Sequence, residues 1–322
     1  MKNYNPKIAA ARAVRENVSH GLSRHTSPEL ARTKVVSILT ETAHVAALTG
    51  FARWLSLVSG RHLKNSTPEY ATRYLNHIAQ TKKQASVSIA RQAINLHLLP
   101  KNQVPYVNSE IATSLENRAY TDAEIELLRH EAQPALSLSI GISASAGLRG
   151  MELITIAPLS ALNPSPRIWH CGLFSGREDQ VRYAVRGKGG LNREIRVTPK
   201  IAEQLDSTAR PHPITVSHRG AHLHSHFDVI GGHAFSIQFG RLSKRILGFS
   251  LGAHGLRHSF CQQRRNELLS LGFSMDHAIK ILSQELGHFC SKNTFAYLRD
   301  QSFQEPGASS DGKESRTYFA YR

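Results

Sequence analysis

The chain is poor in cysteine, poor in acidic residues and without a long apolar run, and each shortage excludes a class of protein. Its 322 residues include only three cysteines, Cys171, Cys261 and Cys290, which are far apart and form no Cys-x-x-Cys pair. A disulfide framework is therefore not expected, and we interpret the chain as cytoplasmic. No apolar run follows the first charged residues, so no signal peptide is expected either.

The best candidate for a membrane span is the uncharged stretch 132–148. It contains Pro134, Gly141, Gly147 and several serines, which makes it too short and too polar to cross a bilayer. We interpret it as a buried helix, and we expect no membrane partner.

Acidic residues are outnumbered by basic ones, which gives the chain a formal net charge of +16. Residues 1–115 contain 15 Lys and Arg against five Asp and Glu, so most of the surplus lies in the first third. Hydrophobic residues make up 40% of the chain, which is enough for a folded core. This balance is typical of a globular protein that binds a polyanion. The basic first third, which we call the front module, is expected to contact a phosphate backbone.

Helix-start signals organise the first third of the chain. We expect residues 1–26, which are polar and basic, to be a flexible N-terminus. Ser27-Pro28-Glu29 and Thr67-Pro68-Glu69 each place an N-cap residue before a proline and an acid, and apolar residues follow at helical spacing. Residues 27–105 are therefore predicted to form a small helical bundle, and residues 106–120 a linker.

A second domain is predicted over residues 121–304. It begins at Thr121-Asp-Ala-Glu124, the pattern of a capping box. Further on, apolar residues alternate with polar ones on either side of Gly187-Lys188-Gly189-Gly190, which predicts a β-hairpin with Lys188 at its tip. The predicted fold class is therefore mainly α with a small β-sheet (α+β).

Two segments of this half lack a clear pattern. Residues 211–234 are rich in glycine and histidine and are expected to be irregular, whereas helical spacing returns after them. Residues 305–322 begin with a low-complexity stretch and are expected to form a C-terminal tail.

Five short motifs of the second domain carry residues that suit chemistry on a phosphate. A lone arginine is usually a solvated surface charge, and a histidine after Leu-Gly usually caps a helix, so each motif alone is weak. In chain order the motifs are Gly147-Leu-Arg149-Gly-Met-Glu152-Leu153, Gly187-Lys188-Gly189, His254-Gly-Leu-Arg257-His258, Leu286-Gly287-His288 and Thr294-Phe-Ala-Tyr297.

Together and in this order, the motifs resemble those of the tyrosine recombinases, the family of phage integrases and Xer-like site-specific recombinases. That family has a first box G-L-R-x-x-E-L, a second box H-x-L-R-H, and a third box L-G-H followed nine residues later by the nucleophilic tyrosine. Tyr297 likewise lies nine residues after His288. The resemblance covers residues from about 121 to 297. It implies a helical core-binding bundle and a catalytic domain that form a C-shaped clamp on DNA.

The resemblance implies the roles of the nucleophile and of two arginines. Arg149 and Arg257 stabilise the charge that develops on the scissile phosphate, since each guanidinium presents two N–H donors in a planar fork. Tyr297 is the nucleophile, which forms a covalent 3′-phosphotyrosine bond and releases a 5′-hydroxyl.

The other implied roles concern protons and structure. His254 is the acid/base partner, because imidazole titrates near neutral pH. Lys188 is the general acid for the leaving 5′ oxygen, and His288 hydrogen-bonds the scissile phosphate. Glu152 is interpreted as a structural residue that buttresses Arg149.

The resemblance also implies partners. They are double-stranded DNA recombination sites and a homotetramer in which four protomers act on two sites, with accessory DNA-bending proteins. It implies no metal, nucleotide or redox cofactor and no ATP, and it places the protein at the nucleoid, encoded by a mobile genetic element. In the front module, Lys82, Lys83 and Arg91 are the expected contacts to the DNA backbone.

Some features leave alternatives open. Five histidines, at positions 218, 222, 224, 226 and 233, crowd into one segment, for which a mobile loop near DNA is the simpler interpretation. Zinc is the alternative, although no cysteine lies nearby and the spacing matches no standard structural site. Tyr318 and Tyr321 are rival nucleophiles by residue type, but they lack the nine-residue relation to His288 and are interpreted as inter-subunit anchors.

Two other functions compete with recombination. A type IB topoisomerase-like enzyme uses similar chemistry to relax DNA, but the small front module and short tail favour the recombinase. A non-catalytic DNA-binding protein with the same fold is the other alternative, and the presence of all six expected catalytic residues argues against it.

Overall fold

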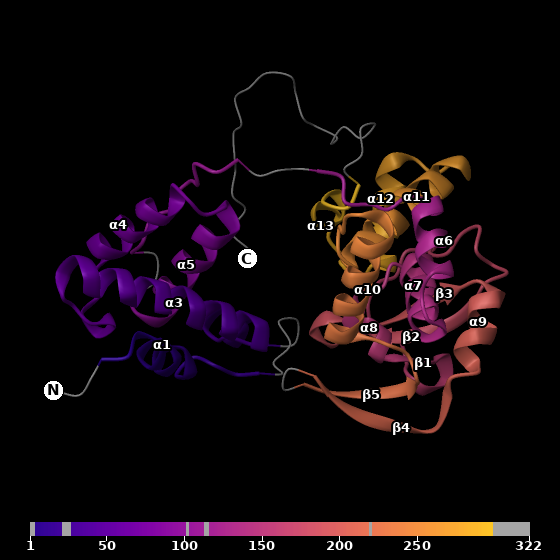
Figure 1. Cartoon of the computed structure of the whole chain (residues 1–322), viewed down its shortest axis with the longest axis horizontal. Coiled ribbons are helices and arrows are strands. Elements are labelled where there is room, and N and C mark those ends of the chain that lie inside the picture. Colours follow the sequence, from indigo (N-terminus) through magenta and orange to yellow (C-terminus); the bar gives the residue numbers. More distant parts are fainter. Residues whose placement is uncertain (1–3, 21–26, 101–102, 113–115, 219–220, 299–322) are drawn as a thin grey trace, which may run out of the picture. The chain divides into compact units, whose positions relative to one another are not determined.

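The computed structural model describes residues 4–20, 27–100, 103–112, 116–218 and 221–298. Figure 1 shows them as helices with two small sheets, so the predicted mainly-α fold class with a small β-sheet is confirmed. Apart from the short segments 188–190 and 217–222, the chain divides near residue 115 into two compact units. No helix within the described ranges is long and apolar enough to cross a membrane.

The first unit is a bundle of helices around one apolar core. The elements of the first unit are α1 (Pro6–Arg15), α2 (Pro28–Thr33), α3 (Ile38–Ser59), η1 (Leu63–Asn65), α4 (Pro68–Ala79) and α5 (Gln84–His97). Thr67 caps α4 as predicted, because its side chain accepts a hydrogen bond from the Tyr70 backbone N–H.

The expectation of a flexible N-terminus is wrong for residues 6–15. They form α1, which begins at Pro6 after the N-cap Asn5 and packs against α3. Ala10 and Val14 are fully buried in the core of the first unit. Two buried positions four residues apart suffice to dock a short helix, although the basic and polar residues around them hide this pattern in the sequence. Residues 21–26 lie outside the described residues.

Replacing Val14 with alanine is expected to lower the free energy of unfolding of the first unit by about 2 kcal/mol, because the change opens a cavity in its core. Urea unfolding measures this change. Ile8 lies on the same helix and is 60% exposed, so Ile8→Ala is the matched control and should cost little. Equal effects of the two substitutions would contradict the packing of α1.

The second unit combines helices with both sheets. The elements from residue 116 onward are α6 (Asp122–His130), α7 (Pro134–Ala146), α8 (Gly150–Ile154), β1 (Ile156–Pro158), η2 (Leu159–Ala161), β2 (Val181–Arg186), η3 (Lys188–Gly190), β3 (Asn192–Val197), α9 (Pro199–Asp206), β4 (Ala209–His218), β5 (Ala221–Phe227), α10 (Gly232–Leu247), α11 (His254–Ser270), α12 (Met275–Glu285) and α13 (Ser291–Phe295). In the first sheet the strand order is β1-β2-β3 and both pairs are antiparallel, whereas β4 and β5 pair only with each other.

Helix α7 is the centre of this unit, and it confirms the buried helix predicted near residues 132–148. It packs against α6, α9, α10, α11 and β3. The predicted capping box is present at the start of α6, where Thr121 and Glu124 exchange hydrogen bonds of 2.8 and 3.2 Å. The predicted hairpin is present as well, with Val181 of β2 opposite Val197 of β3.

The expectation that residues 211–234 are irregular is wrong over most of its length. Residues 209–218 and 221–227 form the strands β4 and β5, and α10 begins at Gly232. In β5 the inward positions Ser225 and Phe227 are buried, and histidines occupy the alternate positions 222, 224 and 226. Because serine and histidine are not typical strand residues, the alternation carries no apolar signal.

The expected linker 106–120 is packed against a unit at each end. The backbone N–H of Glu110 donates to the Ala79 carbonyl at 2.9 Å in the first unit. At the other end, Tyr120 is buried, its backbone N–H donates to Ser259 Oγ at 2.8 Å, and its hydroxyl accepts from the Leu251 N–H at 2.7 Å. Glu110 and Tyr120 therefore each bond to the unit beside them.

Candidate active site

The structure brings together five of the six residues proposed for catalysis, all within the second unit. Segments far apart in the sequence meet there at helix ends and turns. Arg149 precedes α8, His254 and Arg257 lie in the first turn of α11, His288 lies between α12 and α13, and Tyr297 follows α13.

Gly147 ends α7 and sets the path of the chain into Arg149. Its φ of +61° lies in the left-handed region that glycine adopts without steric cost. A Cβ at this position would lie 2.5 Å from Cδ1 of Phe260 and 3.0 Å from Cδ2 of Leu286. A larger residue would displace the core beside the site, which explains why the first motif opens with glycine.

Arg149 is held by the carboxylate three residues further on. Its Nη1 donates to Glu152 Oε1 at 2.9 Å, and its backbone N–H donates to Glu152 Oε2 at 2.9 Å. Its side chain remains 26% exposed. Glu152 therefore fixes one edge of the guanidinium and leaves another edge for a ligand.

Glu152 is the one carboxylate among three arginines. Arg193 forms a double hydrogen bond to it at 3.1 and 3.0 Å, and Arg257 Nη1 lies 3.7 Å from its Oε2. Burial raises the pKa of this carboxyl, but Arg193, Arg257 and Arg149 together hold the pKa well below its usual range. One negative charge facing three positive ones leaves a positive surplus, which suits an anionic ligand.

Arg257 is fully buried at the base of the site. Its Nη1 donates to the Gly147 carbonyl, and its Nη2 donates to the Leu286 carbonyl at 2.7 Å. Burial, followed by the charge of Arg149, lowers its pKa to about 10, so the guanidinium is protonated at neutral pH. Its position therefore depends on the two backbone segments that end at Gly147 and Leu286.

His288 lies between the two arginine forks. Its Nε2 is 2.8 Å from Arg149 Nη2 and 3.0 Å from Arg257 Nη2. Because a guanidinium can only donate, Nε2 must accept, and the ring proton then sits on Nδ1, 3.4 Å from Thr294 Oγ1. The imidazole nitrogen thus occupies the point at which both arginines aim their donors.

Tyr297 lies over this cluster. Its hydroxyl is 3.2 Å from His254 Nε2, and the guanidinium carbon of Arg257 is 5.4 Å from its ring centroid. The ring of His288 stacks on it at 5.4 Å between centroids. The hydroxyl therefore lies beside a histidine, and the ring of the same residue faces a cation.

The histidines of the site are biased towards their neutral forms. Partial burial of the ring, followed by the charges of Arg257 and Arg149, lowers the pKa of His254 to about 4. The rest of this side chain is exposed to solvent. Burial and the same two arginines lower the pKa of His288 to about 3. Burial, followed by His254, lowers the pKa of His258 to about 4.

This bias predicts how the stability of the second unit depends on pH. His258 and His288 take up protons more readily when unfolded, where the imidazole pKa is about 6.5. Stability should therefore rise between about pH 4 and pH 6.5 and then level off. The melting temperature as a function of pH measures this, and the rise should be smaller for His258→Gln.

His130 provides the matched control for that measurement, because its side chain is 83% exposed on α6 of the same unit. His130→Gln should keep the pH dependence of the unsubstituted chain. If His258→Gln keeps it too, then burial of this imidazole makes no contribution to acid sensitivity.

Lys188 is the one proposed catalytic residue for which no contact with the other five is found. It is exposed in η3, the turn between β2 and β3, as its predicted place at the hairpin tip requires. Gly189 follows it with φ of +75°.

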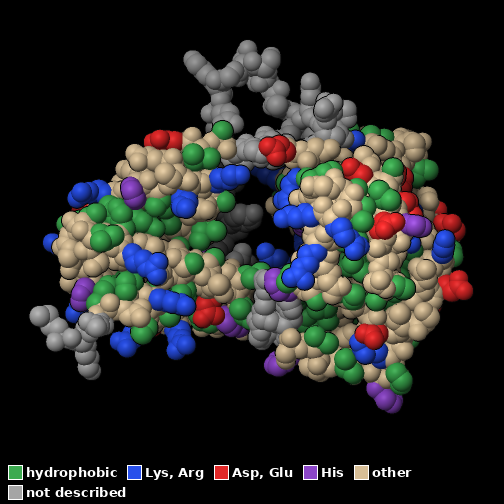
Figure 2. Space-filling view, viewed as in Figure 1, with side chains coloured by type: hydrophobic (Ala, Val, Ile, Leu, Met, Phe, Trp, Pro, Cys, Tyr) green, Lys and Arg blue, Asp and Glu red, His purple; other side chains and the backbone are tan. Residues whose placement is uncertain are grey.

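The proposed DNA-binding residues differ in their surroundings. Lys82 and Lys83 are exposed between α4 and α5. Arg91 is partly buried, and its Nε donates to the carbonyls of Val104 and Pro105 at 2.9 and 3.0 Å. Arg91 therefore also anchors the segment that leaves the first unit. Figure 2 shows basic side chains spread over the visible face of this unit.

Two residues of the site received no role from the sequence. His258 lies within the second motif, with its ring 4.8 Å from that of Tyr297. Arg193 is 1% exposed and pairs with Glu152. It shares the inward face of β3 with Ile195 and Val197, so an arginine in phase with two apolar residues was the available signal.

The histidine-rich segment forms much of the strand pair β4–β5. In its described part, His222 Nδ1 lies 3.1 Å from Ser217 Oγ, and burial lowers the pKa of His226. Among the residues that the structure describes, no three His, Cys, Asp or Glu side chains form a group that could hold a metal ion.

No family model matches the chain, and no curated protein matches its sequence. Solved structures do match it. The chain shares its fold, a helical unit followed by a unit of helices with small sheets, with site-specific recombinases and integrases.

Two of these structures show the extent of the likeness. The XerH site-specific recombinase bound to difH substrate in its pre-cleavage complex has a TM-score of 0.55 and 16% identity, over 94% of this chain and 95% of that chain. A lambda integrase (75–356) dimer bound to a COC′ core site has a TM-score of 0.54 and 15% identity, over 92% of this chain and 100% of that chain. At this level of identity the likeness is one of fold.

Proposed function

We propose that this chain is a site-specific DNA recombinase that cleaves and rejoins DNA strands through a covalent 3′-phosphotyrosine bond. The observation that carries the proposal is the position of Tyr297, whose hydroxyl is 3.2 Å from His254 Nε2 and whose ring centroid is 5.4 Å from the guanidinium carbon of the buried Arg257. A tyrosine in a positively charged site is the arrangement that attack on a phosphodiester needs.

The scissile phosphate binds between the two arginine forks. Its non-bridging oxygen is an acceptor of the same kind as the His288 nitrogen that now receives both Nη2 groups, and it also carries the negative charge that the site lacks. When the oxygen takes this place, His288 is released from the arginines. The ring proton then moves from Nδ1 to the freed Nε2 through solvent, and Nε2 donates to the phosphate.

In the cleavage step, Tyr297 Oη attacks the phosphorus and its proton passes to His254 Nε2. The Oη–P bond forms as the bond from phosphorus to the 5′ oxygen breaks, and Lys188 gives that oxygen a proton. Bound phosphate offsets the arginine charges that lower the pKa of His254, which makes the imidazole a better base. Rejoining is the reverse reaction with the 5′-hydroxyl of another strand, so no ATP and no redox cofactor take part.

The proposed partner is duplex DNA carrying a recombination site, with Lys82, Lys83 and Arg91 on its backbone. The XerH and lambda integrase structures, each bound to its DNA site, support this partner. The proposal includes four protomers on two sites, accessory DNA-bending proteins and a nucleoid location. Inter-subunit contacts are assigned to the tail 305–322, which lies outside the described residues.

Covalent capture from a random DNA library tests the proposal and identifies the target sequence in the same step. Duplexes with a randomised centre and a nick are incubated with the protein, so that a cleaved strand loses its short 5′-hydroxyl fragment and cannot be rejoined. Denaturation then leaves only covalently attached DNA, and sequencing identifies the site. We expect one enriched sequence. Failure to recover any adduct from the library would reject the proposed chemistry.

The recovered site also separates recombination from topoisomerase-like relaxation. Two labelled duplexes that carry the site should yield strands joined across duplexes. Relaxation of supercoiled DNA without any joined product would instead favour the topoisomerase. Binding without an adduct would favour the non-catalytic alternative.

A further inference from the structure

Arg193 is a buried polar residue beside the candidate active site that has no role in the proposed reaction. It lies on β3, and its side chain is only 1% exposed. Its Nη1 and Nη2 donate to the two oxygens of Glu152 at 3.1 and 3.0 Å, and its Nε donates to the Glu285 carbonyl at 2.9 Å. Each of its three nitrogens thus has a partner next to the site.

The first partner leads to Arg149. The Glu152 oxygens that accept from Arg193 also accept from the side chain and the backbone N–H of Arg149, each at 2.9 Å. The double hydrogen bond from Arg193 fixes the plane of this carboxylate, and the carboxylate in turn fixes the guanidinium of Arg149.

The second partner leads to His288. Glu285 is the last residue of α12, and the turn Leu286-Gly287 connects it to His288. Gly287 has φ of +73°, and a Cβ there would lie 3.4 Å from Cδ of Arg193. Arg193 therefore supports the turn both by its hydrogen bond to the Glu285 carbonyl and by packing against Gly287.

Stability alone does not account for this arginine. A buried ion pair contributes little compared with apolar residues of the same volume, because removing two charges from water offsets their attraction. Its neighbours on the inward face of β3, Ile195 and Val197, are apolar, and a third apolar residue would extend that face. What an apolar residue could not do is hold a carboxylate and a carbonyl at defined positions.

We propose that Arg193 is a positioning residue for DNA cleavage, which holds Arg149 through Glu152 and the His288 turn through the Glu285 carbonyl. This inference rests on the proposed function. It also assigns a second task to the β2–β3 hairpin. The strand that follows the Lys188 turn orients the phosphate-binding groups.

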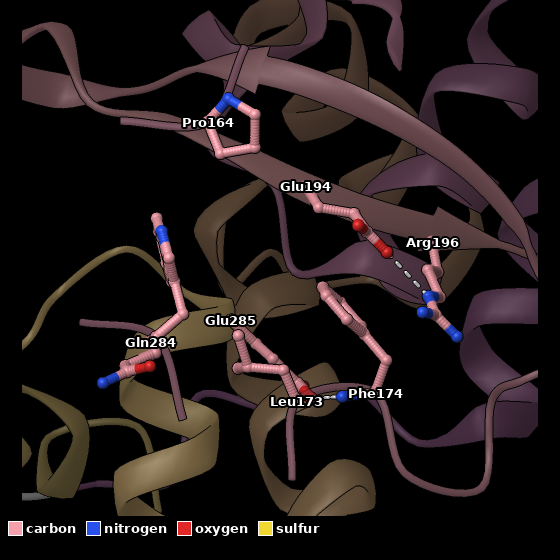
Figure 3. A pocket seen from close by; sticks show the side chains of 8 residues that line it. Pro164, Leu173, Phe174, Glu194, Arg196, Gln284 and Glu285 are labelled. Carbon is pink, nitrogen blue, oxygen red and sulfur yellow. Dashed lines mark hydrogen bonds and ion pairs between the residues drawn. The ribbon is translucent and has the colours of Figure 1, made fainter. Parts of the chain in front are cut away.

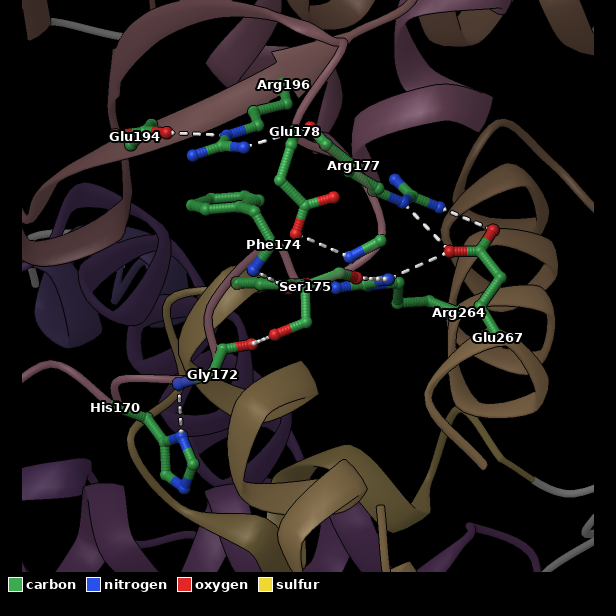
Figure 4. Close-up of polar contacts among 12 residues, drawn as sticks. His170, Gly172, Phe174, Ser175, Arg177, Glu178, Glu194, Arg196, Arg264 and Glu267 are labelled. Carbon is green, nitrogen blue, oxygen red and sulfur yellow. Dashed lines mark hydrogen bonds and ion pairs between the residues drawn. The ribbon is translucent and has the colours of Figure 1, made fainter. Parts of the chain in front are cut away.

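Arg196 provides a matched control on the same strand. Its Nε donates to Glu194 at 2.8 Å, and its Nη1 donates to the Arg177 carbonyl at 2.9 Å (Figure 4). It lines a cavity of about 240 Å³ together with Glu194 and Phe174 (Figure 3). None of these partners belongs to the catalytic cluster, so Arg196→Lys tests the general cost of replacing a paired arginine in β3.

The decisive experiment compares Arg193→Lys with Arg196→Lys in single-turnover cleavage of the site recovered from the library. Lysine keeps the charge opposite Glu152, so the variant should fold, but it cannot donate to both oxygens and to the Glu285 carbonyl in a planar fork. We expect Arg193→Lys to bind DNA within about twofold of the unsubstituted chain and to cleave about 100-fold more slowly, as misplaced catalytic groups do. Arg196→Lys should cleave at the unsubstituted rate.

A second substrate identifies the route through which Arg193 acts. Replacing one non-bridging oxygen of the scissile phosphate with a methyl group removes the charge that Arg149 stabilises. The defect of Arg193→Lys should therefore shrink at least tenfold on this methylphosphonate, in parallel with the defect of Arg149→Ala. Arg193→Gln, which keeps one donor nitrogen and no charge, provides a second test of the same pattern.

Three outcomes would overturn the inference. The first is unchanged cleavage by folded Arg193→Lys. The second is an equal defect on both substrates with a lowered melting temperature, which would make Arg193 merely structural. The third is an equal loss in Arg196→Lys. Absence of any adduct with the unsubstituted chain is a different result, because it rejects the proposed function itself.

Discussion

Replacing Tyr297 with phenylalanine should abolish covalent capture of DNA and leave binding unchanged. The substitution removes a single oxygen, the one that lies 3.2 Å from His254. Loss of a nucleophile costs about 10⁴- to 10⁶-fold in rate, so adducts should fall below detection. The ring contacts with Arg257 and His288 remain, so the fold of the site and its affinity for duplex DNA should persist. Denaturing gels measure the adduct, and fluorescence anisotropy measures binding.

The tail provides the control for this result. Tyr318 and Tyr321 are the rival nucleophiles, so the double variant Tyr318→Phe/Tyr321→Phe should trap DNA as the unsubstituted chain does. An adduct that persists in Tyr297→Phe and disappears in the double variant would move the nucleophile into the tail.

Glu152→Ala should cause the largest loss of stability in the second unit, about 3–5 kcal/mol. The carboxylate is 2% exposed, and its removal leaves Arg193 and Arg257, which are 1% and 0% exposed, without their shared counter-charge. Breaking a buried pair by removing one partner is costly because the remaining charge stays desolvated. In a domain of this size the melting temperature should fall by about 10 °C. Thermal unfolding measures the change.

Glu194→Ala is the matched control for burial. Glu194 also pairs with two arginines, but the side chain of Arg182 is 55% exposed and that of Arg196 is 17% exposed. Water can solvate these groups after the substitution, so the cost should be about 1 kcal/mol or less. Similar losses in the two variants would mean that the Glu152 cluster is not a desolvated network.

The same cluster sets the response to acid. Because its neighbours lower the folded-state pKa of Glu152, the stability that this ionised carboxylate contributes is fully present above its unfolded-state pKa of about 4.3. That stability is lost progressively as the pH falls from about 4.3 towards the lower folded value. Above about pH 4.3, acid destabilisation is therefore driven by other groups, among them His258 and His288.

Much of the site could be predicted from short-range sequence patterns. The spacing of the motifs pointed to Arg149, Arg257, His288 and Tyr297, and the structure places them together. This succeeds because each lies at a helix end or turn whose geometry is set locally, for example by Gly147 with its left-handed backbone. The hairpin with Lys188 at its tip and the capping box at Thr121 were predictable for the same reason.

Other features depended on partners distant in the sequence. Helix α1 is stable because Ala10 and Val14 find a buried surface on the first unit, although its own composition suggested a flexible segment. The strands β4 and β5 pair with each other despite a histidine-rich sequence without apolar alternation. Local propensity is a weak guide where tertiary contacts supply most of the free energy.

The sequence alone therefore determined which residues we propose for chemistry on a phosphate, because the order and spacing of their motifs resemble those of the tyrosine recombinases. Only the tertiary structure showed that Arg193 pairs with Glu152, and that the Nε2 of His288 lies between two arginines as an acceptor. Residues 152 and 193, like 149 and 288, are separated by long stretches of chain. The charge balance of a buried cluster is a sum over such distant neighbours, so no local pattern in the sequence contains it.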